Sequence, residues 1–389
     1  MSIVDRWLLP DGVEDVLPDT ARKLEQARRT LLDRYDSWGY EYVIPPMLEF
    51  LDSLLTGTGQ DLNLKTLKVT DLVSGRTMGV RADMTPQVAR IDAHSLNRKG
   101  VVRLCYAGTV VHSKADNMLA SRTPLHVGAE LFGSTGQQAD LEIVSMMVDS
   151  LASLGVQDVH LELGDVSIFR MLTQDLALAE VARDELFEMI QRKAFHELDA
   201  ALQSLNLAEE TRDQIRQLPM LCGDIGVLDR ANDMFKGRSD ILARIENLRS
   251  VGEALKRRFD DIDLYFDLSE LRGYDYHTGI VFAAYTGGSE RAVAIGGRYD
   301  DIGEVFGRKR GATGFTVRLM DLVHYVPELM PRAEKVVVES NEFDASLWSK
   351  VHELRANGYV VVESGEPGQA DHVLVKETGG WVLKPPVDR

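Results

Sequence analysis

The stretch VVRLCYAGTVVHSKADNMLASRTPLHVGAELFG, residues 101–133, contains two apolar runs with the composition of β-strands. Between them lies ADNMLASRT, residues 115–123, which is polar and rich in turn-forming residues. Two strand-like runs joined by such a segment predict an antiparallel hairpin with a long loop. Because strands arrive here in hairpins while helices are grouped elsewhere, we expect an α+β fold built on an antiparallel sheet flanked by helices.

Helical patterns occur on both sides of this hairpin. Residues 20–38 have apolar side chains at spacings of three and four, which predict an amphipathic helix. Residues 167–258 are almost purely helical in pattern, and we interpret them as a helical insertion between two halves of a sheet domain. Residues 313–326, TGFTVRLMDLVHYV, are also expected to be helical.

Composition divides the chain into two parts. Residues 1–325 contain the expected sheet and the helical insertion. Residues 333–389 alternate short apolar runs with one helical segment, which predicts a small C-terminal α/β domain. At about 55 residues this part is near the lower size limit for independent folding.

The overall composition is that of a soluble, acidic protein. The 389 residues are 44% hydrophobic and 27% charged, with a formal charge of −17, which argues against broad contact with a polyanion. We find no credible signal peptide or membrane span. Cys105 and Cys222 have no His or Cys neighbours at metal-ligand spacing, so we expect a reducing cytoplasm, no disulfide and no structural zinc.

The first of three polar clusters is GVRADMTPQ, residues 79–87. Asp83 and Thr85 would share one face if the segment were extended, where they could contact a ligand. Alternatively, either residue could cap a helix that begins near Pro86. Both roles fit these residues.

The second cluster lies in the second half of the hairpin, where three residues of one face are His126, Gly128 and Glu130. They alternate with three apolar residues of the other face, Leu125, Val127 and Ala129. A buried glutamate among small and apolar residues rarely lacks a partner. We therefore expect Glu130 to face a ligand.

The third cluster is LRGYDYHTGIVF, residues 271–282. Arg272 could hold a carboxylate or a phosphate through two hydrogen bonds, or it could pair with Asp275 or Glu270. IGGRYDDIG, residues 295–303, lacks the spacing of a phosphate-binding loop, so we interpret it as a tight turn between a strand and a helix.

Together the clusters suit an amino acid. A carboxylate such as Asp83 or Glu130 can receive an ammonium group, and Arg272 can receive an α-carboxylate. A second carboxylate with Tyr276 or His277 could hold a polar side chain. No nucleophile with an adjacent base is visible, so no catalytic residue is expected.

Several of these segments resemble the histidyl-tRNA synthetase family. The resemblance runs in order over residues 1 to about 325 and includes the proline-ended helix and strand unit, the hairpin and the terminal strand and helix, which look like the three motifs of class II synthetases. It rests on PDGVEDVLPDT, VRADMTPQVAR, LCYAGTVVH, GAELFG, LRGYDYHTGIVF and GGRYDDIGEVFG. This resemblance implies the class II synthetase-like fold and a histidine-binding domain over residues 1–325.

The departures from that family concern ATP. Active members carry an Arg and a Glu that grip ATP where this chain has His112 and Lys114. An Arg for the ATP phosphates is replaced by Asp321, and a small glycine by Arg318. A carboxylate repels a triphosphate, so the adenylation half is expected to be disabled. The last 60 residues are also too short for the family's full anticodon-binding domain.

The amino-acid half is retained, and this combination looks like the ATP phosphoribosyltransferase regulatory subunit family. The resemblance implies a non-catalytic protein without cofactor or metal that binds a short catalytic subunit, activates it, and mediates feedback inhibition by L-histidine in histidine biosynthesis. It also implies a homodimer core within a hetero-oligomer, with no tRNA and no membrane partner. The alternatives are an active synthetase and a stand-alone histidine sensor.

The resemblance also implies individual roles. Asp83 and Thr85 would bind the α-amino group and Arg272 the carboxylate. Glu130 with Tyr276 or His277 would bind the imidazole. His126, like His277, would replace polar or aromatic contacts of the synthetases.

Overall fold

The computed structural model describes residues 7–56, 60–115, 117, 120–174, 176, 178–271, 273, 276–289, 291–328, 331–339, 345–364 and 370–386. The chain forms two compact units, Met1–Leu329 and Met330–Arg389. Of the helices in the described residues, none is both long and apolar enough to cross a membrane.

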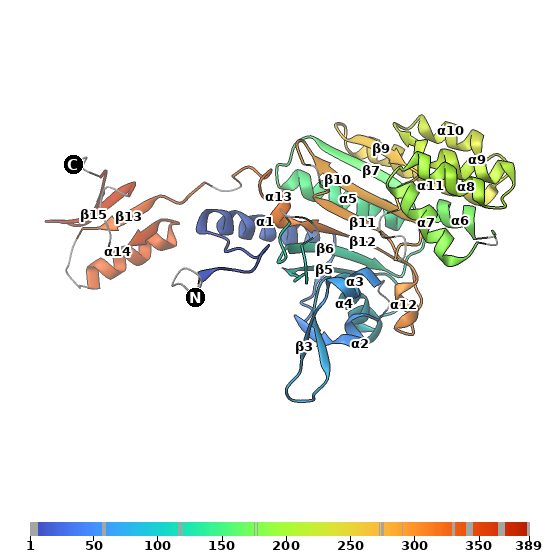
Figure 1. Cartoon of the computed structure of the whole chain (residues 1–389). Coiled ribbons are helices and arrows are strands. Elements are labelled where there is room, and N and C mark those ends of the chain that lie inside the picture. Colours follow the sequence, from blue (N-terminus) through green and yellow to red (C-terminus); the bar gives the residue numbers. More distant parts are fainter. Residues whose placement is uncertain are drawn as a thin grey trace. The chain divides into compact units, whose positions relative to one another are not determined.

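The first unit is built around a nine-stranded sheet with the strand order β1-β5-β6-β12-β11-β10-β7-β9-β8 among the described residues (Figure 1). Most neighbours are antiparallel, while β1 pairs with β5 and β7 pairs with β9 in parallel. The predicted hairpin is confirmed as β5 and β6, and the expected α+β fold is confirmed with it. The strands are β1 (Glu41–Tyr42), β5 (Val102–Thr109), β6 (Leu125–Phe132), β7 (Val159–Asp165), β8 (Cys222–Gly223), β9 (Asp263–Asp267), β10 (Ile280–Thr286), β11 (Ala294–Arg298) and β12 (Ala312–Arg318).

Three long helices pack on one face of this sheet: α1 (Pro18–Ser37), α5 (Gln137–Ser153) and α11 (Ser239–Arg258). Helix α1 starts with proline in its first turn, where the missing N–H costs nothing, and buries the apolar positions that its sequence predicts. It is followed by Gly39, whose φ of +82° suits the left-handed turn after a helix. The main core joins these helices to the β6 residues Val127, Ala129 and Leu131.

The opposite face of the sheet carries a smaller core under α4 (Thr85–Arg90), which continues as a π-helix (Ile91–Leu96), and α12 (Ile302–Val305). A three-stranded sheet with the order β2-β4-β3 belongs to the same unit. Its strands and adjoining helices are β2 (Leu48–Phe50), β3 (Leu67–Thr70), β4 (Thr77–Val80), α2 (Leu51–Leu54) and α3 (Gln60–Lys65).

The helical insertion is present between β7 and β9 (Figure 1). Besides α11 and the two-residue strand β8, it consists of α6 (Ser167–Thr173), α7 (Glu180–Gln191), α8 (Phe195–Ser204), α9 (Glu209–Gln217), the 3₁₀ turn Leu218–Met220 and α10 (Val227–Met234).

The prediction of a helix over residues 313–326 is wrong for its first half. Residues up to Arg318 form β12, between β6 and β11, and only the short helix α13 (Leu319–Leu322) follows. Thr313, Phe315 and Val317 are buried, and alternation with Gly314 and Thr316 is the period of a strand.

The second unit has a four-stranded sheet with the order β14-β13-β15-β16 and one helix against it. Buried valines and leucines of the strands pack on this helix together with Trp381. The elements are β13 (Lys335–Val338), α14 (Ala345–Ala356), β14 (Val360–Val362), β15 (His372–Glu377) and β16 (Gly380–Lys384).

Candidate functional site

Glu130 lies in the middle of the sheet, on the face opposite the long helices. In β6 it is paired with Leu104 of β5 on one side and with Gly314 of β12 on the other. Only 1% of Glu130 is exposed. A Cβ atom on residue 314 would overlap the Glu130 carboxylate, so the glycine makes room for this acid on the floor of the sheet.

Three hydroxyl groups donate hydrogen bonds to the Glu130 carboxylate. Thr85 Oγ1 lies 2.8 Å and Tyr106 Oη 3.1 Å from Oε1, and Tyr299 donates to Oε2. The Tyr106 hydroxyl also contacts Thr316 Oγ1 at 2.7 Å. Burial raises the pKa of Glu130 to about 8, although the hydrogen bonds from Tyr299 and Thr85 oppose this rise.

A cavity of about 180 Å³ lies against Glu130, and we call it the glutamate cavity. Five of the residues predicted from the sequence line it: Asp83, Thr85, Glu130, Tyr276 and His277. The structure therefore brings together residues that are far apart in the chain.

Tyr276 is the unusual member of this lining. Its ring stacks on Tyr299, with centroids 5.0 Å apart, and meets the His277 ring edge to face at 5.2 Å. Its hydroxyl oxygen is buried and has no hydrogen-bond partner among the described residues. Buried hydroxyl groups are nearly always hydrogen-bonded, so this atom indicates a place for a bound group.

Asp83 and Thr85 do not lie on one extended segment, because helix α4 begins at Thr85. Asp83 Oδ1 accepts the backbone N–H of Met84 at 2.6 Å and that of Thr85 at 3.5 Å. Burial raises the pKa of Asp83, and these two N–H groups oppose the rise. Asp83 thus supports the start of the helix and also lines the glutamate cavity, so its two predicted roles are compatible.

Two other predicted residues are placed differently. His126 does not line the glutamate cavity but a neighbouring one, which shares Asp83 with it. Arg272 lies outside the described residues.

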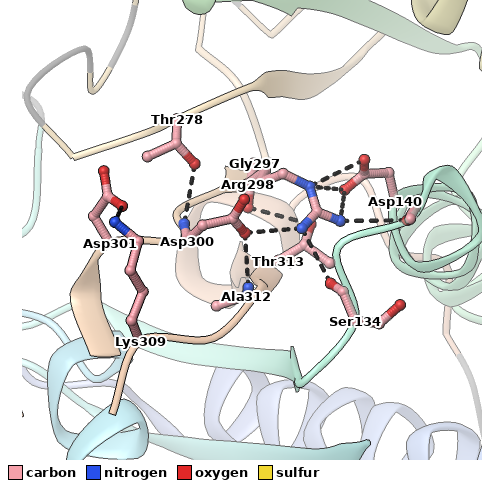
Figure 2. Close-up of polar contacts among 11 residues, drawn as sticks. Ser134, Asp140, Thr278, Gly297, Arg298, Asp300, Asp301, Lys309, Ala312 and Thr313 are labelled. Atoms are coloured by element: carbon pink, nitrogen blue, oxygen red, sulfur yellow. Dashed lines mark hydrogen bonds and ion pairs between the residues drawn. The ribbon is translucent and has the colours of Figure 1, made fainter. Parts of the chain in front are cut away.

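Arg298, at the end of β11, binds carboxylates on two sides (Figure 2). Its Nη2 lies 2.7 Å from Asp140 Oδ1 on helix α5, and its Nη1 lies 2.8 Å from Asp300 Oδ1. Asp300 also accepts the backbone N–H of Ala312 and donates its own N–H to Thr278 Oγ1. Arg298 is thus a buried structural residue at the end of β11, and the interpretation of the following residues as a tight turn between a strand and a helix is confirmed.

Several residues of the site were not predicted from the sequence: Tyr106, Glu270, Gly297, Tyr299, Gly314 and Thr316. Tyr299 and Thr316 gave no local signal, because only pairings between distant segments place them near Glu130. Tyr106 gave none because its position depends on the register of the hairpin. The glycines did give a signal, since glycine inside a strand often marks close approach of another group. At Gly297 a Cβ atom would lie 2.5 Å from His277 Cδ2.

Metal chemistry finds no support in the described residues. Within them, no group of three or more His, Cys, Asp or Glu side chains is placed to hold a metal ion. Cys105 and Cys222 are both free thiols.

Comparison with known proteins gives consistent results. The family model described as histidyl-tRNA synthetase matches residues 12–322. The ATP phosphoribosyltransferase regulatory subunit of Ectopseudomonas mendocina (strain ymp) is 46% identical over 395 residues, covering 99% of this chain and 99% of that protein.

Solved structures agree at the level of the fold. An ATP phosphoribosyltransferase regulatory subunit/histidyl-tRNA synthetase from Bacillus halodurans C has a TM-score of 0.80 at 26% identity, covering 92% of each chain. A chain of the ATP phosphoribosyl transferase (HisG:HisZ) complex from Thermotoga maritima has a TM-score of 0.59 at 17% identity, covering 78% of this chain and 98% of that one.

Proposed function

The chain belongs to the family of ATP phosphoribosyltransferase regulatory subunits, and from this membership we propose that it binds L-histidine and passes the occupancy of its site to a catalytic subunit. The expected partner is the short-form catalytic subunit, which joins ATP to phosphoribosyl pyrophosphate. In this proposal a homodimer core activates that partner in a hetero-oligomer, and histidine inhibits the assembly. The Thermotoga maritima structure supports the proposal because it is a complex.

The observation that carries the histidine site is the unsatisfied Tyr276 hydroxyl beside Glu130 in one cavity. The cavity is smaller than the roughly 300–1,000 Å³ of sites for drug-sized ligands, which suits a free amino acid. The Tyr276 hydroxyl can donate a hydrogen bond to an imidazole nitrogen or accept one from it. Burial also raises the pKa of Tyr276, so the hydroxyl keeps its proton and can act as the donor.

The remaining lining fits the other groups of histidine. Asp83 lies where it can attract the α-amino group, and Glu130 holds Thr85 and Tyr299 in place through their hydroxyls. His277 donates from Nδ1 to the Gly273 carbonyl oxygen at 3.2 Å, and both residues line the cavity. We keep the sequence-based role of Arg272 as the ligand of the carboxylate, while His126 belongs to the neighbouring cavity.

We further propose that the chain does not adenylate histidine. His112 Nε2 donates to the Ala82 carbonyl oxygen at 3.1 Å, so this nitrogen already has an internal acceptor. Asp321 places a carboxylate 4.0 Å from Arg291 in the neighbouring cavity. That cavity is also only about 180 Å³, which is small for a nucleotide.

The first test is calorimetric titration of the full chain with L-histidine, using histidinol and ATP as control ligands. We expect saturable histidine binding and no ATP binding. Tyr276→Phe removes the hydroxyl without leaving a buried group unpaired, so it should weaken histidine binding by about tenfold, or about 1.4 kcal/mol, without loss of stability. Tyr359→Phe, in the second unit, is the matched control and should bind as the wild type does.

Three results would change the assignment. Equal histidine affinity of wild type and Tyr276→Phe would remove the glutamate cavity as the site. ATP binding with histidine-dependent pyrophosphate exchange would instead support an active synthetase. A histidine-binding chain that does not alter the activity of the short catalytic subunit would be a stand-alone sensor.

A further inference from the structure

A broad groove lies beside the start of helix α1, and we call it the α1 groove. Its lining comes from the residues before α1, the first turns of α1, the loop between β5 and β6, the loop before β11, and α13 with the residues after it. Helices α1 and α13 are in contact there (Figure 1). The groove has a volume of about 1150 Å³, which exceeds the roughly 300–1,000 Å³ of small-molecule sites. Such a groove suits a segment of another protein better than a free metabolite.

The lining of the α1 groove is largely apolar. Leu24 and Val323 form its base, where they are 6% and 2% exposed and belong to the main core. Met320 packs against the same core. Val16 and Leu17 lie at the entrance and are 38% and 69% exposed. An apolar lining that is open to water at one side is typical of a surface that binds another protein.

Exposed apolar side chains continue along the segment that precedes α1. Trp7, Leu8 and Leu9 are 82%, 70% and 48% exposed. The segment is nevertheless fixed to the rest of the unit, because the carbonyl oxygen of Gly12 accepts the backbone N–H of Arg122 at 2.7 Å. Apolar side chains that are already held in place lose little freedom on binding, and tryptophan is among the residues that contribute most to protein interfaces.

The charge of the groove defines the partner further. Arg291 and Asp321 lie 4.0 Å apart, so their charges largely offset each other. Glu14 and Asp15 are exposed, and within the described part of the chain no cation pairs with them. The remaining charge is therefore negative, and a complementary surface carries lysine or arginine beside its apolar side chains.

The α1 groove is connected to the candidate histidine site through strand β12. Gly314 and Thr316 of β12 line the glutamate cavity, while Met320 and Asp321 of α13 line the groove. Helix α13 follows β12 without an intervening residue. A partner bound to α13 and a ligand beside Glu130 can therefore both favour one position of β12, which is the physical requirement for coupling between two sites.

We propose that the short catalytic subunit docks on the α1 groove and on the segment before α1, through an apolar segment flanked by lysine or arginine. The inference rests on the proposed function, because it names the surface for the partner proposed there. The connection through β12 favours this surface, since the proposed function requires that the partner and histidine influence each other.

The first test measures the Kd between the full chain and the purified short catalytic subunit by calorimetry. Leu17→Ser should raise this Kd by tenfold or more. Serine is favoured at the N-cap position that Leu17 occupies, so helix α1 should be retained. Val181→Ser on α7 is the matched control, because Val181 is 68% exposed against 69% for Leu17, and its Kd should be that of the wild type.

A second pair of variants tests the charge. Asp15→Lys should raise the Kd of the catalytic subunit by tenfold or more at low ionic strength, and by less at high ionic strength, because salt screens exposed charges. Asp184→Lys makes the same change at an exposed position of α7, and its Kd should be that of the wild type at both ionic strengths.

Separate outcomes overturn the proposal. A wild-type Kd in both Leu17→Ser and Asp15→Lys would place the catalytic subunit elsewhere, and equal losses in Leu17→Ser and Val181→Ser would remove the groove as a specific surface. If Leu17→Ser alters self-association of the chain in sedimentation velocity but leaves the Kd of the catalytic subunit unchanged, the groove binds a second copy instead.

Failure of the proposed function gives a different result. A wild-type chain that does not bind the catalytic subunit would overturn the proposed function and this inference with it. Retained binding by the wild type with no effect of the groove variants would overturn the inference alone. The histidine Kd of the isolated Leu17→Ser chain should equal that of the wild type, because Leu17 does not line the glutamate cavity.

Discussion

At the scale of single residues, Glu130 is the acid on which the candidate site depends. Its carboxyl group accepts hydrogen bonds from side chains of three separate segments, through Thr85, Tyr106 and Tyr299. The same burial that makes these hydrogen bonds strong also disfavours the charged form of the acid. Glu130 therefore holds a proton at a pH where an exposed glutamate is ionised.

This proton makes stability depend on pH. The pKa of Glu130 is about 8 in the folded chain, against 4.5 as reference, so between these values only the folded state keeps the proton. The contribution of this proton to the free energy of unfolding is fully present below pH 4.5 and is lost as pH rises through 8. The loss is at most about 1.4 kcal/mol per pH unit. Glu130→Gln should lose this component, and denaturant unfolding at several pH values between 5 and 8 measures it.

Glu142→Gln is the opposite control for this experiment. Burial raises the pKa of the Glu142 carboxyl group, but the hydrogen bonds and charge around it, including the hydrogen bond from Arg103, hold this pKa below its usual value. The stability it contributes is present above the unfolded pKa and is lost on acidification, so it should be constant from pH 5 to 8. Parallel stability curves for wild type and Glu130→Gln over this range would show that Glu130 is ionised like an exposed acid.

Local sequence could identify the acid but not its surroundings. The alternation in residues 122–133 placed Glu130 on a buried face, and the structure confirms that position. Tyr299 and Gly314 reach Glu130 only through strand pairings and loops that join distant segments, and Tyr106 reaches it through the register of the hairpin. Such long-range pairing is not readable from a local period.

At the scale of elements, a buried ion pair fastens helix α5 to strand β11. Arg298 and Asp140 are each 5% exposed at the side chain, and their closest atoms are 2.7 Å apart (Figure 2). The residue after Arg298 is Tyr299, which donates to Glu130. The pair therefore also fixes the backbone next to the candidate site.

Asp140→Asn should be strongly destabilising. It leaves a buried guanidinium with Asp300 as its remaining carboxylate, and breaking such a pair costs about 3–5 kcal/mol. Asp229→Asn is the matched control, because Asp229 also binds an arginine but its side chain is 74% exposed. Exposed ion pairs contribute at most about 1 kcal/mol to stability. Urea unfolding of both variants gives the comparison, and similar losses in the two would contradict a structural role for the buried pair.

The misassigned segment 313–326 shows where helical patterns mislead. Its C-terminal half, with Leu319, Leu322 and Val323, does have helical spacing and is buried. In the first half, the alternation of Thr313, Phe315 and Val317 belongs to a strand inside the sheet. The two periods adjoin without a proline or a turn, so a single window mixes them.

At the scale of the whole molecule, the histidine proposal requires two states of the assembly with different histidine affinities. Coupling of this kind is reciprocal and is typically about 5- to 150-fold. The factor by which the catalytic subunit changes the histidine Kd should therefore equal the factor by which histidine changes the subunit's Kd. Titrations of the chain with each ligand, in the presence and absence of the other, measure both factors.

Tyr276→Phe provides the control for this cycle. This variant should need a higher histidine concentration than the wild type for the same change in the Kd of the catalytic subunit. Without histidine, the Kd of the catalytic subunit should be that of the wild type. Unequal factors would exclude a simple two-state linkage, and factors of one would exclude regulation by histidine through assembly.

The general fold was accessible from sequence because its elements carry strong local signals. The hairpin at residues 101–133, helix α1 and the helical insertion all appear where their patterns place them. The order of the nine strands does not follow from such patterns, since β6 pairs with β12 and β7 with β10 across long intervals of chain. The site depends on this order.

The stacked pair Tyr276 and Tyr299 has a practical consequence for measuring occupancy. Neither tryptophan of the first unit, Trp7 or Trp38, lines the glutamate cavity. A ligand that hydrogen-bonds to the Tyr276 hydroxyl changes the electronic environment of this coupled chromophore. Near-ultraviolet difference absorbance can then follow filling of the cavity in real time, on the unlabelled chain.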